Sequence, residues 1–125
     1  MNFIFMLTRN DATVANAREV YREIADLPLQ YVGFKDIGLP AAELTALAQD
    51  MHRDGKTVML EVVSERREDE LRSARAALDI GVDYLPGGTH AAEVLPIVPG
   101  SGITYFPLPG RIVGHPSLLR GTIEE

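Results

Sequence analysis

Three ionisable residues stand where two apolar segments end. Lys35 and Asp36 close one segment, and Glu61 lies near the end of the next. If the segments are neighbouring strands, a cation and a carboxylate come together. Such a lysine can donate a proton to a developing enolate, with Glu61 or Asp36 as base or as ligand of a divalent metal, or it can form a Schiff base. The alternative is a cross-strand ion pair that only seals a core. We predict Lys35, Asp36 and Glu61 as the catalytic residues of any active site.

A glycine-rich turn is the first candidate for substrate binding. Gly87, Gly88 and Thr89 precede an expected short helix. Their backbone amides and the threonine hydroxyl could hold a phosphate or a carboxylate. The alternative is an ordinary glycine turn with Thr89 as a helix N-cap.

A second candidate is the run 110–117, which combines Arg111 and His115 with two glycines. A guanidinium in a flexible loop suits anion capture. His115 could equally mark a turn before Pro116, and one histidine gives no metal-ligand spacing. With Arg9, which follows the first apolar segment, Arg111 and His115 complete the predicted substrate-binding set. No zinc, P-loop, Ser-His-Asp or dinucleotide motif is present, so no cofactor is evident and a divalent metal stays an option.

The elements that must position these residues alternate between short apolar strands and amphipathic helices. The expected strands cover residues 2–7, 30–35, 57–63, 82–85 and 103–106. Helical spacing fills the intervals, and Pro28, Gly55 and Gly81 mark helix ends. The charged stretch 65–72 alternates in sign and predicts a solvated helix face. Residues 107–116, rich in proline and glycine, predict a long, shaped loop.

This pattern predicts an α/β protein of parallel β/α repeats, with residues 1–125 as a single domain. Two architectures accommodate it: a half TIM barrel of four to five β/α units, or a flavodoxin-like doubly wound sheet. We favour the half barrel, because polar residues follow nearly every strand and no dinucleotide fingerprint is present. The chain has 125 residues, against roughly 250 for a closed barrel. Residues 122–125 fit a capping box, which predicts truncation at the start of a fifth helix; the alternative is a frayed tail with a chance match.

Composition narrows the range of partners. The formal net charge of -6 argues against nucleic acid, which needs clustered basic residues. The longest apolar run near the N-terminus is far below the roughly 20 residues that span a membrane. The chain has no cysteine, which fits a reducing compartment, and we expect it in the cytoplasm. A half barrel exposes two strand edges and one sheet face, so we also expect a homo-oligomer.

Four segments carry a resemblance to a known family. They are 33–38 (Gly-Phe-Lys-Asp-Ile-Gly), 60–63 (Leu-Glu-Val-Val), 87–89 (Gly-Gly-Thr) and 109–117 (Pro-Gly-Arg-Ile-Val-Gly-His-Pro-Ser). The chain resembles the N-terminal half of a ribulose-phosphate-binding-type barrel, loosely like N-acetylmannosamine-6-phosphate epimerase or orotidine-phosphate decarboxylase. The resemblance implies Lys35 as a proton donor and Asp36 as its partner. The decarboxylase pattern Asp-x-Lys-x-x-Asp is not met, because Gly33 and Gly38 occupy its acidic positions.

The resemblance implies a partial barrel related to phosphosugar isomerases, epimerases or lyases, with a small anionic metabolite as its ligand. Barrels of this kind hold phosphate in the loops after strands seven and eight, so a half barrel should be weak or inactive alone. The alternative is a non-catalytic oligomeric scaffold or a small-molecule binding module.

Overall fold

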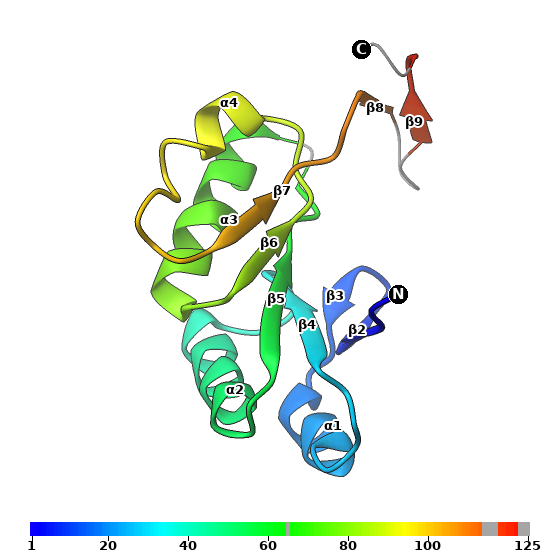
Figure 1. Ribbon diagram of the computed structural model, residues 1–125, viewed down its shortest axis with the longest axis vertical. Coiled ribbons are helices and arrows are strands. Elements are labelled where there is room, and N and C mark those ends of the chain that lie inside the picture. Colours follow the sequence, from blue (N-terminus) through cyan, green and yellow to red (C-terminus); the bar gives the residue numbers. More distant parts are fainter. Residues whose placement is uncertain (65, 114–117, 123–125) are drawn as a thin grey trace.

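The computed structural model describes residues 1–64, 66–113 and 118–122, which contain one five-stranded parallel sheet with helices between its strands. The sheet strands are β1 (Ile4–Met6), β4 (Tyr31–Lys35), β5 (Thr57–Glu61), β6 (Tyr84–Pro86) and β7 (Thr104–Phe106). The helices are α1 (Ala17–Ile24), α2 (Ala41–Arg53), α3 (Arg67–Ile80) and α4 (Ala91–Val94) (Figure 1). The predicted β/α alternation is therefore confirmed. None of the helices in these ranges is long and apolar enough to cross a membrane.

The strands lie side by side in the order in which the chain visits them, β1-β4-β5-β6-β7. A flavodoxin-like sheet reverses its strand order once, at the point where its ligand binds. The observed order has no such reversal, so the doubly wound alternative is not met. Sequential parallel strands are the arrangement within one part of a barrel wall. Here β1 and β7 form the two edges of the sheet.

One face of the sheet packs against the helices. Val32, Phe34, Val58, Leu60 and Leu85 point to this face and are fully buried. They form one core with the inward residues of α1, α2 and α3, which are Ala17, Tyr21, Leu44, Leu47, Ala48, Met51, Ala74, Ala77 and Ile80. Burying a large apolar side chain contributes about 1.5–3 kcal/mol, so this layer accounts for most of the driving force for folding.

The opposite face, which we call the open face, carries the alternate residues of each strand. Lys35 and Glu61 are paired across β4 and β5 on this face. The same face carries aromatic side chains: Tyr31 stacks on Tyr84 with ring centroids 6.1 Å apart, and Tyr84 meets Phe106 edge to face at 5.3 Å. Phe106 is 47% exposed. In a closed barrel this face would be the packed interior.

Two hairpins were not predicted. The first joins β2 (Thr8–Arg9) to β3 (Ala12–Thr13) between the first sheet strand and α1. The second joins β8 (Arg111–Val113) to β9 (Leu118–Arg120), where the sequence predicted a loop, and Figure 1 shows it projecting away from the sheet beyond β7. The predicted start of a fifth helix falls mainly on residues 123–125, which lie outside the described ranges.

Candidate functional site

Lys35 is the centre of a charged cluster on the open face. Its side chain is only 8% exposed, and its Nζ lies 2.7 Å from Asp11 Oδ1 and 3.6 Å from Glu61 Oε2. A buried ammonium group is costly unless acceptors surround it, and these two carboxylates supply them. Both carboxylate side chains are more than 40% exposed, so solvent reaches the cluster at Asp11 and Glu61.

Backbone geometry sets the positions of these three residues. Lys35 and Glu61 are the last residues of β4 and β5 and face each other in register, so they stand at the carboxyl-terminal edge of the sheet. Ligands bind at this edge in parallel α/β proteins. The predicted approach of Lys35 to Glu61 is therefore confirmed.

Asp11 was not among the predicted site residues. Asn10 and Asp11 both have positive φ, 51° and 59°, as the two central residues of a type I′ hairpin turn require. The recognisable signal was an Asn-Asp pair between short segments of strand-forming residues. The turn brings the Asp11 carboxylate to Lys35.

Thr13 holds this hairpin against β4. Its Oγ1 donates to the carbonyl oxygen of Lys35 at 2.7 Å and accepts from the Lys35 backbone N–H at 2.9 Å. The Thr13 backbone N–H donates to Ile37, and Gly38, at φ 104°, lies too close to the Thr13 backbone for a side chain. The pairing of β1 with β4 ends at Gly33, and Thr13 bonds to β4 beyond that point. Thr13 thereby fixes the backbone of Lys35.

Asp36 does not join the Lys35 cluster. Its Oδ2 accepts a hydrogen bond from Ser73 Oγ of α3, on the helix side of the sheet. Successive residues of a strand point to opposite faces, and the same alternation separates Asp36 from Lys35. Its Oδ1 is buried and finds no hydrogen-bond partner within the described ranges. The predicted catalytic set is therefore divided between the two faces.

The Gly87-Gly88-Thr89 turn holds an anion, but that anion is a side chain of the same protein. Glu70 of α3 is 1% exposed and accepts the backbone N–H groups of Thr89 and His90, each at 3.0 Å. Gly88, at φ 81°, packs directly on the Glu70 carboxylate, where a Cβ would collide with it. The amide group of Gly87 donates to Phe106 at 2.9 Å. The amides of Thr89 and His90 are therefore already occupied, and the prediction of a solvated face for residues 65–72 is wrong at Glu70.

The remaining predicted binding residues are not gathered around Lys35. Arg9 is exposed on β2, in the same hairpin as Asp11. Arg111 is exposed on β8, in the hairpin that stands apart from the sheet (Figure 1). His115 lies outside the described residues. The roles predicted for these three residues stay predictions.

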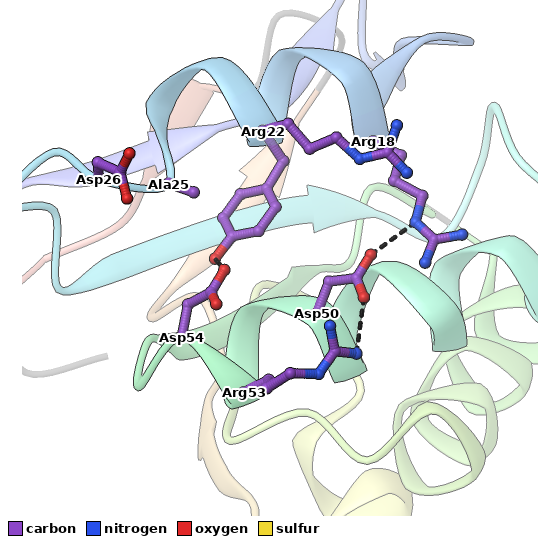
Figure 2. Close-up of a pocket in the computed structure, with 8 residues that line it drawn as sticks. Arg18, Arg22, Ala25, Asp26, Asp50, Arg53 and Asp54 are labelled. Carbon is purple, nitrogen blue, oxygen red and sulfur yellow. Dashed lines mark hydrogen bonds and ion pairs between the residues drawn. The ribbon is translucent and has the colours of Figure 1, made fainter.

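A separate recess of about 310 Å³ lies between α1 and α2 (Figure 2). Asp50 at its centre accepts hydrogen bonds from Arg18 at 2.6 Å and Arg53 at 2.8 Å, and the bond from Arg18 is the main cause that lowers the pKa of Asp50. Tyr21 donates to Asp54 at 2.8 Å, and burial, reinforced by that carboxylate, raises the pKa of Tyr21 well above its ordinary value. These groups pair with one another and join the two helices.

Two further observations bear on the site: the arrangement of possible metal ligands and the similarity of the chain to known proteins. Within the described ranges, no three His, Asp or Glu side chains converge so as to hold a metal ion. No protein-family model, curated protein or solved structure matches the chain significantly. The resemblance to ribulose-phosphate-binding barrels therefore rests on the four sequence segments alone.

Proposed function

We propose that the chain is a partial barrel whose open face binds a small anionic carbonyl compound of the phosphosugar type, and that Lys35 and Glu61 transfer protons on it. The observation that carries this proposal is the nearly buried Lys35 between two carboxylates at the carboxyl-terminal edge of the sheet. Both carboxylates are more than 40% exposed, so a small molecule can reach the cluster.

The arrangement suits an isomerase or epimerase reaction. The Glu61 carboxylate is the more distant partner of the lysine, at 3.6 Å against 2.7 Å for Asp11, and it is 42% exposed. It is therefore the group available to remove a proton from the carbon next to a carbonyl. The electron pair of that C–H bond forms a C=C bond, and the carbonyl oxygen takes the negative charge. Lys35 Nζ then donates a hydrogen to that oxygen. Protonation of the neighbouring carbon gives an isomer, and the hydroxyl proton of the first carbon passes to Lys35 Nζ as the new carbonyl forms. Protonation of the opposite face of the first carbon gives an epimer, and Lys35 Nζ takes back the proton that it donated.

Asp11 has a positioning role in this scheme. At 2.7 Å it is the closer of the two carboxylates to Lys35 Nζ, and it holds the ammonium group at this edge of the sheet. Asp36, which the resemblance assigns as the partner of Lys35, is replaced in this role by Asp11. We assign the phosphate group to Arg9, which is exposed and shares a hairpin with Asp11.

Solvent deuterium exchange tests the proposal without knowledge of the product. Ribulose 5-phosphate, glyceraldehyde 3-phosphate and N-acetylmannosamine 6-phosphate are incubated in D₂O with a high concentration of the protein, and the α C–H resonance is followed by NMR. The chain has two lysines, Lys35 and Lys56, so Lys56→Met is a matched control for Lys35→Met. We expect exchange on at least one compound that falls on the order of 100-fold in Lys35→Met and Glu61→Gln, and stays in Lys56→Met. Equal rates in the two lysine variants, or no exchange at all, would contradict the proposal.

A second candidate function is a homo-oligomeric scaffold, favoured by the open face itself. Ile4 and Phe106 are 41% and 47% exposed there, next to the Tyr31–Tyr84 stack. Exposed apolar surface of this kind is typical of an interaction site. Light scattering across a dilution series should give a dimer or larger species that dissociates in Phe106→Asp, while Leu108→Asp outside the sheet has less effect. A monomer at every concentration would contradict self-association.

A further inference from the structure

Glu70 is an acidic side chain in an unusual environment. It belongs to the charged first turn of α3, yet it is 1% exposed. The backbone N–H groups of Thr89 and His90, the hydroxyl of Tyr105 and the ring of His90 all meet its carboxylate. Burial and the charge of Glu70 raise the pKa of Tyr105 to about 12, so its phenol stays a donor. The carboxylate of α3 is thus fixed by groups from the turn before α4 and from β7.

His90 is oriented by this carboxylate. Its Nδ1 lies 2.7 Å from Glu70 Oε2, and its own backbone N–H is anchored on the same side chain. A carboxylate accepts hydrogen bonds, so in the neutral imidazole Nδ1 carries the hydrogen and Nε2 presents a lone pair. The His90 side chain is 29% exposed, which leaves part of the ring accessible.

The location adds to this geometry. His90 follows β6, and the bridge between Val62 and Gly87 places this turn next to the end of β5. His90 therefore stands at the same carboxyl-terminal edge of the sheet as Lys35. The two residues are separated by two strand spacings, or about 10 Å along that edge. Groups at this edge are the ones that meet ligands in parallel α/β proteins.

We propose that Glu70 and His90 form a carboxylate–imidazole dyad in which Nε2 of His90 is a proton acceptor for the hydrolysis of small carboxylic esters. Nε2 takes a proton from water while the water oxygen bonds to the carbonyl carbon. The carbon–oxygen bond to the alcohol then breaks, and Nε2 returns the proton to the departing oxygen. Glu70 is a positioning residue, because it selects the tautomer and the ring orientation. The dyad shares no residue with the Lys35 cluster, so either proposal can fail alone.

His52 provides a matched control within the chain. Its Nε2 lies 2.8 Å from Asp83 Oδ2, but the Asp83 side chain is 42% exposed and the pair connects α2 to the segment before β6. It is therefore also a histidine–carboxylate pair, but its carboxylate is exposed and accepts one backbone N–H, that of Val58, where the buried Glu70 carboxylate accepts two and a tyrosine hydroxyl.

The test combines a reaction and a spectroscopic signature. Release of p-nitrophenol from p-nitrophenyl acetate is measured for the intact chain, His90→Gln, His52→Gln and Glu70→Gln, with circular dichroism as a check of folding. We expect the rate above buffer to fall at least tenfold in His90→Gln, to stay within twofold in His52→Gln, and to fall in Glu70→Gln although His90 is present. Long-range ¹H–¹⁵N correlation should find the Nδ1–H tautomer at His90. Glu70→Gln should shift the tautomer equilibrium of His90 away from this form. Equal rates in the two histidine variants, or an Nε2–H tautomer in the unmodified chain, would overturn the proposal even if Glu70→Gln fails to fold.

Discussion

Replacement of Glu70 by glutamine should destabilise the protein far more than an ordinary change on a helix. The Glu70 carboxylate accepts from Thr89 N, His90 N, His90 Nδ1 and Tyr105 Oη. Glutamine keeps one oxygen and puts an NH₂ group where a second acceptor stood. About two charge-assisted hydrogen bonds are lost, each worth roughly 1.5–3 kcal/mol. Part of this free energy is recovered if the new NH₂ group donates a hydrogen bond to the tyrosine oxygen. We expect the free energy of unfolding to fall by about 2–4 kcal/mol.

Urea denaturation followed by circular dichroism measures this change, with an unchanged slope against urea as the sign that only stability has altered. Glu68→Gln is the control, because Glu68 lies in the same first turn of α3 and is exposed. It should change the free energy by less than about 0.5 kcal/mol. A loss below about 1 kcal/mol in Glu70→Gln would refute the reasoning that this carboxylate organises the turn after β6.

Three further predictions concern Gly88, Tyr105 and Asp50. Gly88→Ala should cost more stability in urea denaturation than Gly55→Ala, because both glycines have positive φ but only Gly88 lies against Glu70; equal losses would show that the backbone conformation alone matters. In the ultraviolet titration of tyrosine, subtraction of the Tyr105→Phe curve should reveal a phenol that ionises near pH 12, and a value near the ordinary 10.0 would place Tyr105 away from Glu70. The lowered pKa of Asp50 contributes stability that is present above the ordinary pKa of 3.8 and is lost as the pH falls through the pKa of the folded state. The unmodified chain should therefore lose more stability than Asp50→Asn between about pH 5 and about pH 2. Parallel losses in the two proteins would contradict this linkage.

Much of the sheet could be predicted from the sequence, because buried parallel strands are continuous apolar runs bounded by turn residues. The predicted range 30–35 nearly coincides with β4, and Gly81 ends α3 in a left-handed conformation as expected. The register of β4 with β5 then brings Lys35 to Glu61. Strand alternation also separates Lys35 from Asp36, and applying that rule to the sequence would have corrected the predicted catalytic set.

Other parts of the site depended on contacts between residues distant in the chain. Asp11 reaches Lys35 only because a two-residue turn reverses the chain, and the short strands around it have too few residues to show a period. Glu70 looks like any charged residue in the first turn of a helix. It is buried because the glycine turn after β6 folds over it, which no local pattern in α3 reveals.

The most direct test of the central proposal, that the edge of the open face around Lys35 is the ligand-binding site, is amide shift mapping. The ¹⁵N-labelled chain is titrated with ribulose 5-phosphate, and the same titration is repeated with Lys35→Met. The account predicts shifts at Lys35, Glu61 and the Asp11–Thr13 segment that are lost in the variant. Shifts confined to the Arg18–Asp50 recess between α1 and α2, or shifts that persist unchanged in Lys35→Met, would contradict it.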